Sequence, residues 1–287
     1  MTERYNGSFM HWTGALLHIA DKTRWDMAYV AMRMAGYNNC PSIPCYRILY
    51  QAICYLFHHP LVPIMYPNKS INEIVPLKSH FSKGEAEVTS KDYDAHTGLE
   101  AWADADLARD ILGRRSTSSS VHTWGDVAVA SQCVKQPEPG ASTNDAEVRS
   151  LYQATRRTLA YRSILASLGQ PQQYPTPTFE DNAATIAQVL NDKLTPRVKH
   201  IDLLLKWLNN QFSRERMTPI TCSSKDQKGD MNSKPHGGST LQKKFLPLVG
   251  YQYYPPPSSE HYTPLQLDKF IISTHRGSFL KLSHEKE

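Results

Sequence analysis

The first sixty residues have the apolar spacing of helices. Apolar side chains recur every three or four positions, the period of an amphipathic helix, at Met27, Val30, Ala31 and Met34. A further helical run opens at Pro44, since proline is tolerated in a first turn, and it ends at Pro60. The pattern predicts a helical segment over residues 1–60. Residues 61–97 are polar and have no strong period, and we interpret them as a linker.

From residue 98 the pattern changes to alternating strands and helices. Strands are predicted at residues 99–105, 119–130 and 177–179, and helices at residues 145–168, 183–190 and 201–212. The second stretch alternates like a hairpin around Gly125, and Gly169 ends the long helix. The alternation predicts an α/β domain over residues 98–212. Residues 213–287 are polar and rich in Gly, Pro and Ser, which predicts a mostly irregular, flexible tail.

The chain is mildly basic, and its sequence contains no pattern typical of a secreted or membrane protein. The 287 residues carry a formal net charge of +5, which permits nucleic-acid binding without requiring it. Five cysteines without a CxxC pair indicate reduced thiols rather than a disulfide framework. No apolar run approaches the roughly 18 residues of a membrane span, and the start of the chain lacks the pattern of a signal peptide. We therefore expect a soluble cytoplasmic or nuclear protein that is not secreted and has no membrane partner.

Four acidic residues stand in short contexts suited to holding a divalent metal. They are Asp104, Glu147, Asp181 and Asp202. Hard divalent cations take oxygen ligands, above all carboxylates. Two Mg²⁺ ions about 4 Å apart stabilise both the attacking and the leaving oxygen of a phosphodiester. The series therefore predicts a nuclease site for two Mg²⁺ ions, with Mn²⁺ as the alternative metal.

Short strings around these acids resemble those of one family of mobile elements. The strings occupy residues 103–106, 114–118, 142–147, 181–184 and 199–202. In their order and spacing they are similar to the C-terminal part of the Pol polyprotein of copia-type LTR retrotransposons, its connection segment plus ribonuclease H domain. The resemblance covers roughly residues 7–250, and near its end it includes Asp226-Gln227 and Lys234-Pro235.

The resemblance implies a ribonuclease H-like fold with a mixed sheet flanked by helices. It also implies a Mg²⁺-dependent endonuclease that hydrolyses the RNA strand of RNA–DNA hybrids, with the four acids as catalytic and metal-binding residues. Nucleic-acid contacts would come from Arg114, Arg115, Ser116, Thr117, Lys199 and His200. A solvated turn is the alternative for the two arginines, and a structural role is the alternative for His200. The implied partners are the hybrid and a reverse transcriptase domain in trans.

Several positions depart from the family's pattern. Leu107, Arg109 and Val148 stand where the family has Trp, Gly and Tyr. The Tyr-x-Asp-Asp turn of a reverse transcriptase palm is also absent, so we expect residues 1–60 to follow a palm and thumb that this chain lacks. The lost aromatics and glycines favour a second hypothesis, a degenerate, catalytically inactive relic that binds nucleic acid or a polymerase partner. A generic α/β protein with coincidental strings is the third.

Overall fold

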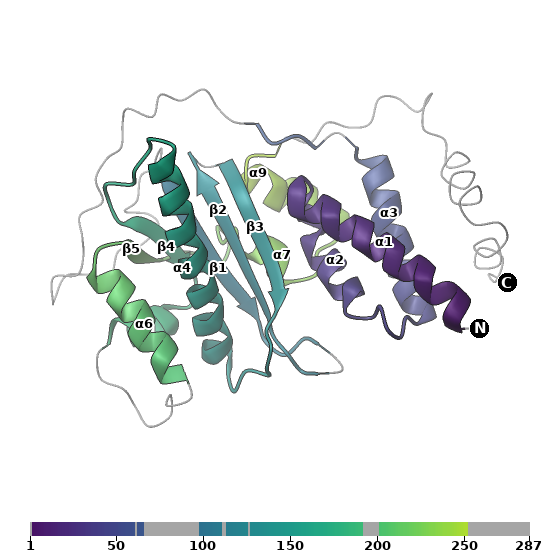
Figure 1. Cartoon of the computed structure of the whole chain (residues 1–287), viewed down its shortest axis with the longest axis horizontal. Coiled ribbons are helices and arrows are strands. Elements are labelled where there is room, and N and C mark those ends of the chain that lie inside the picture. The colour runs from purple at the N-terminus through teal and green to yellow at the C-terminus, as the bar shows by residue number, and fades with distance from the viewer. Residues whose placement is uncertain are drawn as a thin grey trace.

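The computed structural model describes residues 2–60, 62–65, 98–110, 113–125, 127–191 and 201–251. Most of the predicted linker, the chain from residue 252 onwards, and the predicted nucleic-acid residues Lys199 and His200 lie outside the described residues. A sheet with helices on both faces and a group of N-terminal helices beside it make up the described part (Figure 1). No helix in that part has both the length and the apolar character that crossing a membrane requires.

A five-stranded mixed sheet forms the centre of the protein. Its strands are β1 (Leu99–Asp106), β2 (Thr117–Trp124), β3 (Val127–Lys135), β4 (Thr176–Glu180) and β5 (Met217–Thr221), in the order β3-β2-β1-β4-β5. β1, β2 and β3 are antiparallel neighbours, whereas β4 runs parallel to both β1 and β5. Gly125 turns the chain between β2 and β3 with a φ of 58°, a conformation that glycine adopts without steric cost. Because β1 and β4 are parallel, their carboxyl ends lie side by side.

Three helices cover one face of the sheet: α4 (Thr143–Ser167), α5 (Ala183–Leu190) and α6 (Asp202–Ser213). The Ser142 side chain caps α4 by accepting a hydrogen bond from the backbone N–H of Asp145 at 3.1 Å. The core under these helices includes Ala103, Leu151, Leu208, Phe212 and Met217. The arrangement confirms the expected α/β class, a mixed sheet flanked by helices.

Residues 213–251 are folded, which corrects the prediction of an irregular tail from residue 213. β5 extends the sheet beside β4. It is followed by the short turns α7 (Asp230–Ser233), α8 (Gly238–Thr240), η4 (Leu241–Phe245) and α9 (Leu246–Leu248). These turns cover the second face, and their core includes Trp102, Phe179, Met231, Phe245 and Val249. Trp102 of β1 stacks on Phe179 of β4 with ring centroids 3.9 Å apart.

The helices predicted for the first sixty residues are present. They are α1 (Thr2–Lys22), η1 (Trp25–Met27), α2 (Ala28–Ala35) and α3 (Ile43–His58). They share a core of their own that includes Phe9, Leu16, Ala31, Met34 and Leu49. The Tyr251 hydroxyl donates a hydrogen bond to the carbonyl oxygen of Thr23 at 2.7 Å, and its ring packs edge-on against Trp25. This contact joins the helical segment to the last described turn of the sheet domain.

Candidate metal centre at the ends of strands β1 and β4

Three carboxylates meet where β1, β4 and α4 come together. Asp104 lies in β1, Asp181 directly follows β4, and Glu147 lies near the start of α4. Because Trp102 of β1 pairs with Phe179 of β4, the register places Asp104 level with Asp181. One carboxylate oxygen from each of the three acids lies within 4.8 Å of the other two. The structure thus brings together three of the four acids that the sequence predicts as metal ligands.

Two of these carboxylates are almost completely removed from solvent. Asp104 is 1% exposed and Glu147 is 4% exposed, and one buried oxygen of each has no hydrogen-bond partner. Burial raises the pKa of Asp104 to about 7. Burial, with the charges of Asp104 and Asp181 adding to it, raises the pKa of Glu147 to about 9. Buried carboxylates without partners are costly unless a cation balances them, and this set of hard oxygen donors fits a divalent ion.

Buried polar contacts fix the backbone around Asp104. The Ser150 hydroxyl of α4 donates a hydrogen bond to the Asp104 carbonyl oxygen at 2.6 Å. From the other face, the Gln227 amide donates to the carbonyl oxygen of Ala103 at 2.8 Å and accepts from the backbone N–H of Gly229 at 3.0 Å. A Cβ at Gly229 would lie only 3.0 Å from the Cβ of Asp104, so this close approach requires glycine. The carboxylate therefore projects from a backbone held on both sides.

A further buried acid, Glu180, was not predicted from the sequence. It is the last residue of β4, is completely buried, and has one oxygen without a hydrogen-bond partner. Its other oxygen accepts a hydrogen bond from the backbone N–H of Asn182 at 3.3 Å. Burial, followed by the charges of Glu147 and Asp104, raises the pKa of Glu180 well above its ordinary value. The sequence signal for Glu180 was its position beside Asp181 at the end of a predicted strand. The sequence alone does not show which of the two acids is buried.

The structure does not bring Asp202 into this group. Asp202 begins α6 and forms an ion pair with Lys206 one turn later, with Nζ 3.3 Å from Oδ2. Asp230, the first residue of α7, instead lies near Asp104, and its charge helps to raise the pKa of Asp104. Lys234 connects these two acids, because it forms an ion pair with Asp230 and its Nζ lies 3.7 Å from Oδ2 of Asp104. Asp230 is thus the fourth acid that the geometry offers.

The described residues predicted to contact nucleic acid lie at the start of β2. Arg114 has a φ of 51°, and its backbone N–H donates to the carbonyl oxygen of Asp110 at 2.8 Å. The Nε of Arg115 lies 3.7 Å from Oδ2 of Asp110. Ser116 and Thr117 are buried, and the Ser116 hydroxyl accepts a hydrogen bond from a backbone N–H of the turn after β1. The Ser116 hydroxyl therefore stabilises this turn, and the arginines remain the predicted phosphate contacts.

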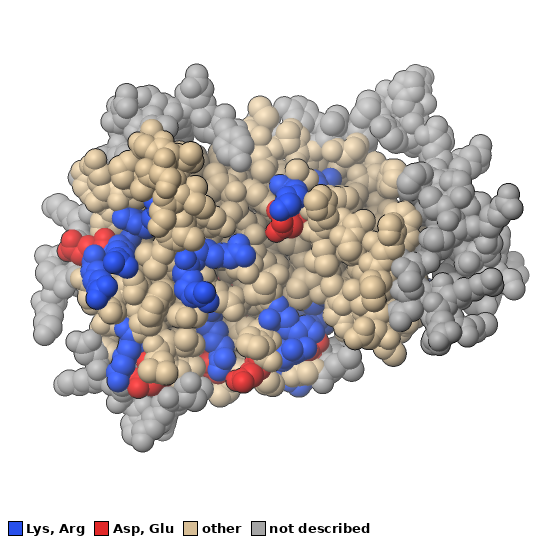
Figure 2. All heavy atoms as spheres, in the orientation of Figure 1, with Lys and Arg blue, Asp and Glu red and all other residues tan. Residues whose placement is uncertain are grey.

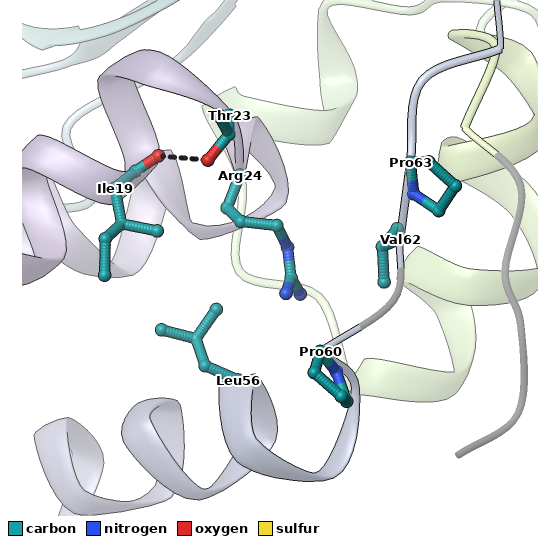
Figure 3. A pocket seen from close by; sticks show the side chains of 7 residues that line it. All are labelled: Ile19, Thr23, Arg24, Leu56, Pro60, Val62 and Pro63. Atoms are coloured by element: carbon teal, nitrogen blue, oxygen red, sulfur yellow. Dashed lines mark hydrogen bonds between the residues drawn. The ribbon is translucent and has the colours of Figure 1, made fainter. Parts of the chain in front are cut away.

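Two hollows in the described part of the protein are lined by residues other than the three acids. One of about 630 Å³ lies between α1, the end of α3 and the segment that follows it, and Figure 3 shows Arg24 pointing into it. The Arg24 guanidinium donates to Asp26 at 2.9 and 2.8 Å and to the His59 carbonyl oxygen at 2.8 Å. The other, of about 720 Å³, separates α2 and α3 from residues 231–241. Asp104, Glu147 and Asp181 line neither hollow, although Lys234, which forms an ion pair with Asp104, lines the second.

A mixed sheet with carboxylates from three elements at adjacent strand ends defines an α/β protein with a candidate divalent-metal centre. No family model matches the sequence. The chain is 25% identical over 243 residues to the retrovirus-related Pol polyprotein from transposon RE2 of Arabidopsis thaliana, across 85% of this chain and 15% of that protein. It is 26% identical over 136 residues to the corresponding polyprotein from transposon TNT 1-94 of Nicotiana tabacum, across 47% and 10%. These matches confirm the resemblance to copia-type Pol polyproteins, of whose length the chain spans about 15% or less.

Three solved structures show a weaker likeness. LC11-RNase H1, isolated from compost, is 14% identical and matches 47% of this chain and 91% of its own with a TM-score of 0.36. The N-terminal RNase H domain of a Mycobacterium tuberculosis protein is 15% identical, with coverages of 44% and 79% and a TM-score of 0.29. RNase H1 from Halobacterium salinarum is 16% identical, with coverages of 44% and 83% and a TM-score of 0.28. At such TM-scores the likeness adds no argument to the geometry described above.

Proposed function

We propose that the chain is a retrotransposon-derived ribonuclease H-type endonuclease that hydrolyses the RNA strand of RNA–DNA hybrids with two divalent metal ions. Its similarity to Pol polyproteins supports a domain of the ribonuclease H type. One observation supports the nuclease activity most directly: carboxylates of Asp104, Glu147 and Asp181 converge within 4.8 Å from three separate elements. Such a cluster costs folding free energy. Binding of a cation would offset this cost, which explains why the carboxylates lie together.

The carboxylates of Asp104, Glu147, Asp181 and Asp230 have distinct roles in this proposal. Asp104, Glu147 and Asp181 would hold one divalent ion, and Asp104 with Asp230 would hold the other. Two bound Mg²⁺ ions supply activation of the attacking water and stabilisation of the leaving oxygen of the phosphodiester. The chain itself fixes these carboxylates on β1, on α4, directly after β4 and on α7 before substrate arrives, and it buries three of them: Asp104, Glu147 and Asp230. No nucleophilic side chain is needed.

The charge of the protein fits a polyanionic substrate. The chain has a net charge of +5, and Figure 2 shows more Lys and Arg than Asp and Glu on the face drawn there. α4 carries Arg149, Arg156 and Arg157, of which Arg156 is exposed and Arg149 is paired with Asp145 at 2.8 Å. Basic side chains of this kind neutralise phosphates of a nucleic-acid duplex. A reverse transcriptase domain in trans is the proposed protein partner.

Cleavage of a labelled RNA–DNA hybrid in the presence of Mg²⁺ tests this function. We expect Asp104→Asn and Asp181→Asn each to lower the cleavage rate at least about a hundredfold, because each removes a metal ligand. Asp230→Asn should lower it as well. Asp202→Asn is the matched control and should keep the wild-type rate, since Asp202 pairs with Lys206 outside the cluster. An equal loss in the Asp202 variant would contradict this assignment of the fourth acid.

The second candidate is a catalytically inactive relic that still binds nucleic acid. The position of Lys234 favours it, because an ammonium group lies against Asp104 and Asp230 where metal is needed. The same assay separates the two hypotheses. Wild-type protein that binds Mn²⁺ and the hybrid but cleaves with neither Mg²⁺ nor Mn²⁺ would support the relic. Wild-type protein that binds no divalent ion would rule out the metal centre.

A further inference from the structure

Lys234 places a positive charge inside the acidic site. Its Nζ forms an ion pair with Asp230 and lies 3.7 Å from Oδ2 of Asp104. Asp104 is 1% exposed, and this same oxygen has no hydrogen-bond partner. The Lys234 side chain is 34% exposed, so its ammonium group reaches the buried carboxylate from the surface of the protein. The lysine therefore has a path back to solvent.

Asp104 belongs to two groups of charged side chains. In the first group, Glu147 and Asp181 approach it to within 4.8 Å, and no lysine or arginine forms an ion pair with either in the described part of the chain. The second group contains Asp230, and the ammonium group of Lys234 forms ion pairs with both Asp230 and Asp104. Two metal ions about 4 Å apart can share one carboxylate, and Asp104 is the acid that belongs to both groups. The two metal positions are therefore unequal.

We propose that Lys234 is a built-in cation that competes with the second divalent ion. The first ion binds to Asp104, Glu147 and Asp181, of which only Asp104 forms an ion pair with the Lys234 ammonium group. The second ion enters beside Asp104 and Asp230 when the Lys234 ammonium group swings out towards solvent. This inference rests on the proposed metal-dependent function and adds an order of binding to it.

The chemistry of lysine suits such a displaceable charge. Its ammonium group is a compact point charge on a flexible four-carbon stem. In the absence of the second ion, it partly neutralises two carboxylates that would otherwise repel each other. A divalent cation and an ammonium group placed against the same carboxylate repel each other, and the repulsion is strong at a poorly hydrated site. Binding of the second ion therefore includes the cost of breaking the Lys234–Asp230 ion pair.

Titration of the full-length chain with Mn²⁺ alone, followed by calorimetry and by the electron paramagnetic resonance signal of free Mn²⁺, tests the proposal without using cleavage. We expect wild-type protein to bind one ion tightly and a second weakly. Lys234→Met keeps the apolar stem and removes the charge, so the second ion should bind at least about tenfold more tightly. Lys234→Arg keeps a cation and should leave the second site weak.

Lys206→Met is the matched control. Lys206 also pairs with an aspartate four residues earlier, but that pair lies outside the acid cluster, so both Mn²⁺ affinities should stay at their wild-type values. Thermal unfolding of each variant without metal shows whether it is folded. If Lys234→Met loses its fold, Lys234→Gln replaces it in the same titration.

Two results would overturn the proposal. A folded Lys234→Met protein with wild-type affinity at both sites shows that Lys234 does not compete. A weaker second site in that variant shows that Lys234 supports the ion instead. In both cases, if wild-type protein binds Mn²⁺ and the Asp104→Asn protein does not, the proposed metal centre still stands. Wild-type protein that binds no Mn²⁺ overturns the centre and this inference together.

Discussion

Replacing Glu147 by glutamine should make the metal-free protein more stable at neutral pH. The Glu147 carboxylate is 4% exposed, lies close to Asp104 and Asp181, and has one oxygen without a hydrogen-bond partner. Burial and these neighbouring charges raise its pKa from 4.5 to about 9. Glutamine keeps the size of the side chain and removes its charge. We therefore expect Glu147→Gln to gain folding stability while it loses affinity for metal.

The raised pKa of Glu147 sets the size and the pH window of this effect. The folded protein holds the Glu147 proton more tightly than the unfolded chain. The contribution of this proton to the free energy of unfolding is therefore fully present below about pH 4.5 and is lost as the pH rises towards 9. Each pH unit is worth about 1.4 kcal/mol, so wild-type protein has lost up to about 3.4 kcal/mol at pH 7. Because Asp104 takes part in the same titration, we expect Glu147→Gln to gain about 1–3 kcal/mol.

Urea denaturation in the presence of a chelator measures this difference. Glu147→Gln should unfold at a higher urea concentration than wild-type protein at pH 8, and the gap should narrow at pH 5. Added Mg²⁺ should stabilise wild-type protein at pH 8 and leave the variant unchanged. Glu138→Gln, at an exposed position, is the control and should differ from wild type by less than about 0.5 kcal/mol. A Glu147→Gln protein no more stable than wild type at pH 8 would refute the claim that these buried charges oppose folding.

Two further substitutions test contacts that support the site. Tyr251→Phe removes the hydrogen bond to the Thr23 carbonyl oxygen and should cost about 1–2 kcal/mol of unfolding free energy in a urea titration; an unchanged midpoint would show that this contact does not hold the helical segment to the sheet domain. Ser142→Ala removes the N-cap of α4, the helix that carries Glu147, and should cost about 1 kcal/mol. Ser142→Asp keeps a capping oxygen and should restore the lost stability.

The helices and the first strands were predictable because their signals are local. The apolar period of residues 28–35 recurs in α2, whose buried residues are Ala31 and Met34. α4 follows Ser142, a residue type that favours helix caps, and ends before Gly169, which has a φ of 77°. Such signals depend on neighbouring residues in the sequence. They do not depend on which elements later pack together.

The folded part of the predicted tail was missed because its buried residues are polar. Gln227, Asn232 and Ser233 are completely buried although their composition is that of an exposed loop. Burial is tolerated because their side chains find partners, as when Gln227 donates to the backbone of β1. β5 has only five residues and contains Pro219, which weakens its strand pattern. Partners supplied by distant strands leave no local periodicity in the sequence.

Local sequence motifs could not distinguish Asp202 from Asp230 as the fourth acid of the cluster. Asp202 and Asp230 each begin a helix, and each forms an ion pair with a lysine four residues later. Their local contexts are therefore alike, and the Lys-His-Ile-Asp string favoured Asp202. The sheet separates them, because α6 packs on the face covered by α4, whereas Gly229 brings the start of α7 against the side chain of Asp104. Which aspartate lies beside Asp104 is therefore set by packing between elements far apart in the sequence, and neither local motif shows it.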